Sequence, residues 1–464
     1  MSEHLLEKLN LGLAVRIFVD SVSYSSPLPL WTQLADFQYE FVSMQVGRSL
    51  RKVLNGEQQI RPAFEMKVPY KKDDLRTWFT PSLTMQIILQ ACTAKIGSAD
   101  KLDNTSSKRI FTYNNTPNTS DFLTDQLDQW LLFQDQTKKQ LETHEYILQL
   151  DVKQYFASVD RRRFAAFLKA KTADEIVVDF LIRLLDGWMQ DRPGLPLIND
   201  SLFYLGDAYL NTVDDIIGRH TGKFIRFMDD YRLFSNKRSD LENVYSMISR
   251  DLAVAGYKIN QMKLRLGSKA DYFKSISQIE RINDAMAADE MIDDGREYLG
   301  PMLFTKVVSP VQLANFIEIV VGDASRLLTI RPGRLLMREI RKLRTNKQIG
   351  SDVFSSYLAA LSAKPGLRTK ILRLIQDYAA VNGAEWQLVW LLYLLEDVIV
   401  AGDAKSGERA QIEFLVRQTH LNPIVSLWAR RLLGIWEKIP PVGDVFAHKD
   451  ADYLEQGRLL YGAN

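Results

Sequence analysis

Two segments that read as β-strands end in aspartate, and this restricts the fold of the chain more than any other feature. The apolar run Tyr146–Leu150 leads into Asp151, and a second strand-like run leads into the adjacent pair Asp229-Asp230. Carboxylate oxygens on rigid strands suit Mg²⁺, which keeps water and phosphate oxygens in its remaining positions. Two such ions about 4 Å apart can activate a 3′ oxygen and hold a triphosphate. The pattern is therefore what a two-metal nucleotidyl-transfer site requires.

The residues on both sides of Asp229-Asp230 predict a β-hairpin. Apolar residues alternate through 223–227 before the pair and through 231–234 after it. An Asp-Asp pair is also found in ordinary surface turns, where aspartate is favoured for its local hydrogen bonds. The alternation favours instead a hairpin that carries negative charge at its turn.

Composition sets outer limits on the function. With 464 residues the chain is long enough for two or three domains. Its net charge of +2 means that any basic surface for nucleic acid must be local. One cysteine, Cys92, excludes both a disulfide framework and a cysteine-based zinc site.

No membrane association is expected. The first residues contain no positively charged region that leads into a signal peptide. The most apolar stretch, Trp386–Ala401, is interrupted by Glu396 and Asp397 and is too short to span a bilayer. We therefore expect a cytoplasmic protein.

Three further segments stand in a fixed order around the aspartates: Gly194-Leu195-Pro196, Leu205–Leu210 and Gly256–Lys263. The first predicts a turn. The second lies in one long expected helix that reaches Asp214, and another helix is expected from Ser239 to Ala255.

With the aspartates, these segments resemble reverse transcriptases of the bacterial retroelement type over roughly Arg61–Ser275. At the same places that family has Gly-x-Pro, Leu-Ala-Asn-x-Tyr-Leu and Gly-Leu-x-x-Asn-x-x-Lys. The resemblance implies the fingers and palm of a right-hand polymerase. The chain departs from it after Pro196, where Leu197 and Ile198 replace Gln or a small residue and then Gly, and where Ser201 and Leu202 replace Thr-Ser. These departures concern template handling and leave the carboxylate chemistry untouched.

The resemblance also implies the roles of the site residues. Asp151, Asp229 and Asp230 are expected to be catalytic and to bind two Mg²⁺ ions, for which Mn²⁺ can substitute. The backbone of Val152 is expected to add a metal ligand.

Several residues are expected at the incoming nucleotide. Lys67–Arg76 resembles an extended basic fingers segment, in which arginine suits bidentate phosphate recognition and lysine supplies a point charge. Phe156 corresponds to the bulky residue under the sugar, where its ring would collide with a 2′-hydroxyl and so favour dNTPs. The expected nucleotide-binding residues are Lys71, Arg76, Tyr155, Phe156 and Lys263.

Beyond the palm the pattern is helical. The strand-like pattern stops within Asp271–Val308, and helices are expected at Leu367–Ala380, Trp386–Val400 and Arg409–Trp436. The tryptophans of these helices are expected in their core. Within the fingers and palm, the polar stretch Lys101–Ser120 predicts a loop. The expected fold is α+β, with a helical extension (1–60), reverse transcriptase fingers and palm (61–275), a connector (276–308) and an all-α, HEAT-like domain in the thumb position (309–464).

A basic stripe is expected on one helix of that domain. Arg334, Arg338 and Arg341 share a helical face, where they can follow a phosphate backbone. A solvated amphipathic helix explains the same pattern equally well.

A divergent palm joined to a helical domain most resembles the abortive-infection and unknown-group antiphage reverse transcriptases of bacteria. This implies a homo-oligomeric DNA polymerase in phage defence that uses dNTPs and releases single-stranded DNA. The resemblance leaves open whether it copies a noncoding RNA template or works without a template, and whether priming is by protein. Tyrosines expected in flexible segments are the candidate primers: Tyr24, Tyr453 and Tyr461.

Two alternatives remain open at this point. An RNA-dependent RNA polymerase shares the palm and the Asp-Asp hairpin, although Phe156 and Gly256–Lys263 argue against it. The second alternative is a catalytically silent helical scaffold that binds nucleic acid or a phage protein. The presence of all three carboxylates argues against this alternative.

Overall fold

The computed structural model describes residues 2–25, 39–71, 74–98, 109–112, 126–276, 367–380, 385–398, 406–417 and 423–436. The fold is of the expected α+β class, mostly helical with small sheets. Two compact units are built from discontinuous segments, within Met1–Ile17, Ile60–Pro62 and Leu89–Glu290 for the first and within Phe18–Gln59, Ala63–Ile88 and Met291–Asn464 for the second. The contiguous domain boundaries expected from the sequence stay a prediction.

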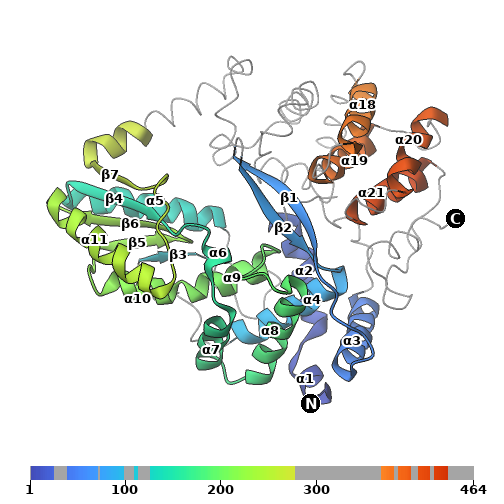
Figure 1. Cartoon of the computed structure of the whole chain (residues 1–464), viewed down its shortest axis with the longest axis horizontal. Helices are drawn as coiled ribbons and strands as arrows, with labels where there is room; N and C mark the ends of the chain where they lie inside the picture. Colours follow the sequence, from blue (N-terminus) through green and yellow to red (C-terminus); the bar gives the residue numbers. More distant parts are fainter. Residues whose placement is uncertain are drawn as a thin grey trace. The chain divides into compact units, whose positions relative to one another are not determined.

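In the described part of the first unit, a five-stranded sheet lies at the centre. In spatial order it contains β3 (Ile110–Phe111), β5 (Phe224–Phe227), β6 (Asp230–Ser235), β4 (Tyr146–Asp151) and β7 (Arg265–Ser268) (Figure 1). All pairings are antiparallel except that of β3 with β5. The predicted strand before Asp151 and the predicted hairpin around Asp229-Asp230 are both confirmed.

Helices cover both faces of this sheet. On one face Ile147, Ile225 and Phe234 pack with Phe133 and Leu141 of α5 (Gln126–Thr143). On the other face lies α11 (Arg238–Ala255), which packs against α10 (Asn211–Gly218) as well as the strands. Because side chains alternate along a strand, each strand contributes to both layers.

The helix predicted from Ser239 to Ala255 is confirmed by α11, which ends at Gly256 with a left-handed φ of 94°. The single long helix predicted through Asp214 is wrong. α9 (Asp200–Tyr209) and α10 (Asn211–Gly218) are separate, with Leu210 between them. Leu210 keeps helical φ and ψ (−60°, −15°), so the apolar periodicity continues through the break.

Four further described helices belong to this unit. They are α1 (Ser2–Lys8), α6 (Tyr155–Ser158), α7 (Arg161–Lys171) and α8 (Glu175–Met189). Asp160 caps α7 by accepting hydrogen bonds from the backbone of Arg163 and Arg162, and these bonds lower the pKa of its carboxyl group. Asp174, which precedes α8, forms ion pairs with Lys8 and Lys95, so α1 and α4 (Leu83–Gly97) are tied to this end of α8.

The second unit contains a two-stranded sheet and helices. β1 (Phe64–Lys71) and β2 (Asp74–Thr80) form an antiparallel hairpin, which confirms the extended segment expected at Lys67–Arg76. The described helices that lie in or reach into this unit are α2 (Leu11–Ser25), α3 (Tyr39–Asn55), α4, α18 (Leu367–Ala379), α19 (Glu385–Val398), α20 (Ser406–Arg417) and α21 (Pro423–Trp436).

The C-terminal helices follow the sequence prediction with one correction. α18 packs against α19, and α21 packs against α19 and α20. Trp386 and Trp428 are buried, as expected, whereas the side chains of Trp390 and Trp436 lie outside the described part. The continuous helix expected over Arg409–Trp436 is wrong, since α20 ends at Arg417 and Pro423 begins α21. Proline is favoured at a first helical position because it has no N–H to donate.

Two smaller expectations also need correction. Ile110–Phe111, within the expected loop Lys101–Ser120, form the edge strand β3. Tyr24, expected in a flexible segment, belongs to the last turn of α2. Among the described helices none is long and apolar enough to cross a membrane.

Candidate functional site

The ends of β4 and β6 bring two of the predicted aspartates together. Asp151 is the last residue of β4, Asp230 is the first of β6, and the two are direct partners in the antiparallel register. Residues opposite each other across antiparallel strands project from the same face. Asp229 lies next to Asp230 in the turn after Phe227, so the three carboxylates belong to one end of the sheet.

The turn between β5 and β6 is conformationally unusual. Met228 has a φ of 52°, in the left-handed region that residues other than glycine rarely occupy. Holding it there costs about 1–2 kcal/mol. Surrounding contacts must therefore fix the turn, which determines how Asp229 and Asp230 are presented.

Electrostatics distinguish Asp230 from an ordinary surface carboxylate. Burial raises the pKa of the Asp230 carboxyl to about 6, and the negative charge of Asp151 acts in the same direction. Arg232 and Lys263 act in the opposite direction without cancelling the shift. A carboxylate with a raised pKa beside a second one is the arrangement expected where a cation is to bind.

Asp151 is held by the segment that follows α11. Its Oδ1 accepts a hydrogen bond from Asn260 Nδ2 at 3.0 Å, and its Oδ2 forms an ion pair with Lys263 Nζ. The backbone N–H of Asn260 also donates to the Asp151 carbonyl at 2.8 Å. The block Gly256–Lys263 singled out in the sequence therefore meets the first aspartate directly.

The donors at this end of the sheet suit a hard divalent cation, because they are carboxylates. In the part of the chain that the structure describes, no three or more His, Cys, Asp or Glu side chains are grouped to hold a metal ion. Each carboxylate oxygen of Asp151 is occupied by Asn260 or Lys263. A cation that binds Asp151 shares these oxygens with the two donors or displaces one of them. Lys263 is the one that can leave, since its side chain is long and 34% exposed.

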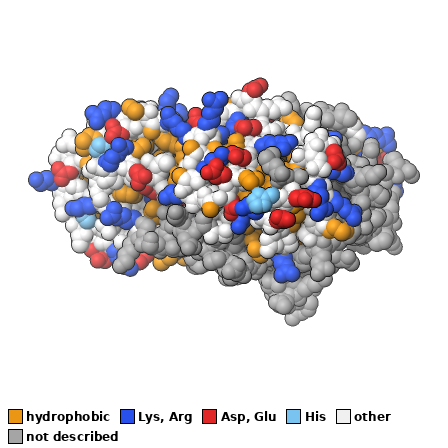
Figure 2. All heavy atoms as spheres, turned by 90° about the horizontal axis from the view of Figure 1, so that it is seen from below, with side chains coloured by type: hydrophobic (Ala, Val, Ile, Leu, Met, Phe, Trp, Pro, Cys, Tyr) orange, Lys and Arg blue, Asp and Glu red, His pale blue; other side chains and the backbone are white. Residues whose placement is uncertain are grey.

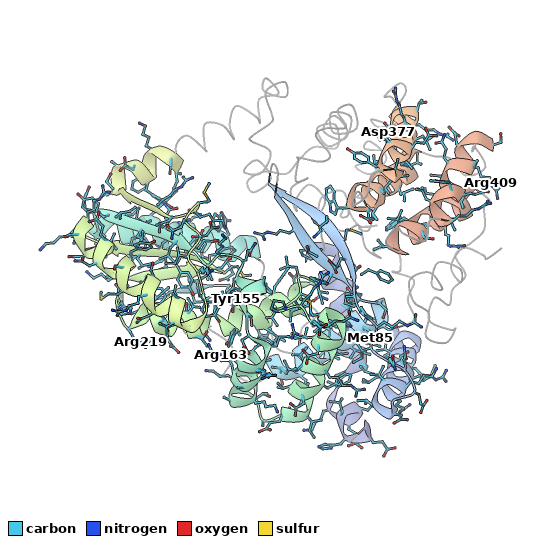
Figure 3. The ribbon with its side chains drawn as sticks, viewed as in Figure 1. Met85, Tyr155, Arg163, Arg219, Asp377 and Arg409 are labelled. Carbon is cyan, nitrogen blue, oxygen red and sulfur yellow. The ribbon has the colours of Figure 1, made fainter. Side chains whose placement is uncertain are left out.

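The residues that follow Asp151 have different surroundings. Val152 is buried and forms a β-bridge with Ile259. Tyr155, labelled in Figure 3, is only 2% exposed, and its hydroxyl donates to the Gly206 carbonyl at 2.8 Å. Its side chain is therefore fixed to α9, and the nucleotide contact expected of Tyr155 stays a prediction. Phe156 is half-buried, with its ring edge-on to those of Tyr155 and Phe203.

The predicted turn at Gly194 is confirmed and explains the glycine. Gly194 has a φ of 86°, and a Cβ there would come within 2.6 Å of Ala157 Cα and of the Phe156 carbonyl. The next residue, Leu195, donates its N–H to the same carbonyl at 2.7 Å. The turn thus packs directly on the segment that carries Phe156.

The departures from the reverse transcriptase pattern after Pro196 are largely internal. Ile198 and Leu202 are buried, and the hydroxyl of buried Ser201 donates to Gln90 of α4. These three side chains are therefore core residues, and the role of this loop in template handling stays a prediction.

Sequence reasoning missed a buried charge network behind the hairpin. Arg226 lies on β5 with Asp207 and Asp214 as its carboxylate partners. The signal was present, since Arg226 interrupts the apolar run Phe224-Ile225-Arg226-Phe227.

The other predicted residues lie in the second unit or outside the described residues. Arg76 is a half-buried residue of β2 in the other unit, and the side chain of Lys71 lies outside the described part. Arg334, Arg338, Arg341, Tyr453 and Tyr461 also lie outside the described residues. On the face that Figure 2 shows, basic and acidic side chains are interspersed, as the small net charge suggests.

Comparison of the chain with protein-family models and with curated protein sequences finds no match.

Replacing Asp230 with Asn is expected to stabilise the metal-free protein above pH 6. The folded pKa of about 6 exceeds the ordinary value of 3.8, so the folded state carries a partly desolvated negative charge at neutral pH. Since one pKa unit corresponds to about 1.4 kcal/mol, we expect a gain of about 1–3 kcal/mol at pH 7.5 that disappears towards pH 4. Thermal unfolding in a chelator from pH 4 to 8 measures this. A loss of stability, or a gain independent of pH, would contradict the burial of this carboxylate.

Replacing Lys263 with Met is expected to strengthen divalent-cation binding about three- to tenfold, because it removes the group that competes for Asp151. The readout is a Mn²⁺ titration followed by electron paramagnetic resonance. Lys237→Met, at the exposed start of α11, removes the same charge elsewhere and serves as the control. Equal affinities in the two variants would mean that Lys263 does not compete with the cation.

Proposed function

We propose that this protein is a Mg²⁺-dependent DNA polymerase of the reverse transcriptase superfamily. The observation that carries the proposal is the register of β4 and β6, in which Asp151 stands opposite Asp230 beside the turn residue Asp229. The order of the Gly194 turn, α9, the hairpin, α11 and the Gly256–Lys263 segment supports the same proposal. The fold would then be the fingers and palm of a right-hand polymerase.

In this proposal Asp151, Asp229, Asp230 and the Val152 carbonyl hold two Mg²⁺ ions, or Mn²⁺ in their stead. When bound, the ions supply activation of the 3′ oxygen and neutralisation of the triphosphate charge. Asn260 orients the Asp151 carboxylate through its 3.0 Å hydrogen bond. Lys263 contributes its positive charge to the triphosphate once its ion pair with Asp151 is broken.

Substrate choice is proposed to depend on Phe156. The half-buried Phe156 ring packs between the rings of Tyr155 and Phe203. It therefore has little freedom to move away from a ribose. A 2′-hydroxyl would collide with such a ring, so dNTPs are the proposed substrates.

The remaining parts complete the proposal. The β1–β2 hairpin, with Lys71 and Arg76, acts as fingers, and the C-terminal helices act as a HEAT-like domain in the thumb position. The biological role is phage defence, in a cytoplasmic homo-oligomer that makes single-stranded DNA either from a noncoding RNA template or without one. Protein priming would use a tyrosine hydroxyl. The primer candidates are Tyr24, which lies in the last turn of α2, and Tyr453 and Tyr461.

One assay tests the proposed function directly. The purified protein is incubated with Mg²⁺ and each labelled dNTP or NTP, with and without an RNA template. Incorporation of dNTPs is the expected result. Incorporation of NTPs alone would favour an RNA polymerase, and no incorporation of either would favour a binding scaffold.

Asp151→Asn and Asp229→Asn are each expected to reduce dNTP incorporation at least about 1,000-fold while the protein stays folded. Losing one metal carboxylate removes about 4 kcal/mol of transition-state stabilisation, and asparagine preserves the side-chain volume. Asp135→Asn, which removes an exposed carboxylate of α5, is the matched control. Wild-type incorporation by either site variant would refute the assignment.

Phe156→Val is expected to increase rNTP incorporation relative to dNTP about tenfold or more. A pocket distinguishes one small group by about 1–3 kcal/mol, and this discrimination is lost when the ring is removed. Competition between labelled dNTP and rNTP measures the ratio. An active Phe156→Val enzyme with unchanged sugar selectivity would show that the ring serves packing alone.

A further inference from the structure

We infer that the Gly206-Asp207 step of α9 is a positioning element that holds the two aspartate-bearing segments at a fixed separation. Gly206 meets the segment that follows Asp151, and Asp207 reaches the Asp229-Asp230 turn through Arg226. The inference rests on the proposed function in assigning chemistry to those aspartates. The physical linkage can be tested without it.

Arg226 connects α9 and α10 to the turn. Its side chain is 0% exposed and is the largest among the fully buried side chains of the described residues. Its Nη1 lies 2.6 Å from Asp207 Oδ1, and its Nε lies 2.9 and 3.1 Å from the two oxygens of Asp214. An arginine removed from water in this way is tolerated only with close carboxylate partners. The guanidinium is therefore fixed with respect to α9 and α10.

The same guanidinium holds the turn. Arg226 Nη1 also donates to the carbonyl of Met228 at 3.1 Å. Met228 is the residue with the left-handed φ of 52°, and Asp229 follows it. The backbone of the unusual turn is thereby connected to Asp207 through a single nitrogen. Tyr231, on the far side of the turn, donates its hydroxyl to Asp214 at 2.8 Å, which secures the start of β6 to α10.

The other end of the element meets the segment after Asp151. The Gly206 carbonyl accepts the hydroxyl of Tyr155 at 2.8 Å. The ring of Phe156 covers Gly206 so closely that a Cβ there would lie 2.8 Å from Phe156 Cζ. A side chain at position 206 would push the ring away, so Tyr155 and Phe156 both contact the same glycine.

The two residues of this linkage, Asp207 and Arg226, are each unusual at their positions in the sequence. Asp207 stands where the resembled reverse transcriptase block has asparagine, and Arg226 stands in a strand whose other residues are apolar. Each residue is unexpected alone. Together they form an ion pair at 2.6 Å, with an Asp207 side chain that is 1% exposed. The charge at position 207 is therefore explained by its partner at 226.

The test compares Asp207→Asn with Asp174→Asn. Both variants remove a carboxylate that pairs with basic side chains in the same unit, but Asp174 pairs with Lys8 and Lys95 away from the hairpin. Hydrogen–deuterium exchange is measured on peptides covering 224–235 and 238–255. For Asp207→Asn we expect exchange of the hairpin peptide to rise about tenfold or more, with the α11 peptide unchanged. Asp174→Asn should leave both peptides as in the wild type.

Kinetics supply the second readout. With dNTP substrate, Asp207→Asn is expected to lower kcat about tenfold or more while KM changes less than about threefold, since misplaced carboxylates affect the reaction more than substrate binding. Arg226→Lys keeps the charge but cannot reach both carboxylates and Met228, so it should show the same pattern to a smaller extent. It also serves if Asp207→Asn fails to fold.

The outcomes separate the two ideas. Unchanged exchange in the hairpin, or equal loss of protection across both peptides, would overturn the positioning role. Increased hairpin exchange with wild-type kcat would also overturn it. If the wild-type protein incorporates no nucleotide, the proposed function fails, while selective exchange of the hairpin still supports the physical linkage.

Discussion

The antiparallel pairing of β4 with β6 is the interaction on which the rest of the site depends. Its register sets Asp151 opposite Asp230. Because side chains alternate along a strand, a shift by one residue would turn Asp230 to the other face of the sheet. The register is itself fixed by burial, since Ile147 and Phe234 face the α5 layer from neighbouring positions of the same two strands. Core packing and the arrangement of the carboxylates are therefore one constraint.

Features that cost stability gather at this end of the sheet. Desolvation raises the pKa of Asp230, Met228 has a left-handed backbone, and Arg226 is a fully buried charge. Each is expensive alone, and strained or perturbed groups of this kind tend to gather at functional sites. The apolar layers on both faces of the sheet supply the stability that keeps them in position. This concentration of costly features supports a functional interpretation independently of the resemblance to reverse transcriptases.

The segment Ile198–Asp207 shows how a departure from a family pattern can be interpreted. In the sequence, Ile198 and Leu202 are differences that concern template handling, whereas Asp207 lies in a block that resembles the family. In the structure Ile198 and Leu202 are core residues, and Asp207 is the partner of Arg226. In the folded chain these positions serve packing and a buried ion pair. What α9 and the loop before it do with a template stays a prediction.

The sequence by itself determined the local elements: the strand before Asp151, the hairpin around Asp229-Asp230, the turn at Gly194 and the helix that ends at Gly256. These follow from alternation, helical periodicity and glycine, which act over a few residues. Only the tertiary structure decided three interactions: the ion pair of Lys263 with Asp151, the hydrogen bond of Tyr155 to the Gly206 carbonyl, and the ion pair of Arg226 with Asp207. Each of these joins residues far apart in the chain. Their energies come from burial and charge pairing, which a linear pattern does not contain.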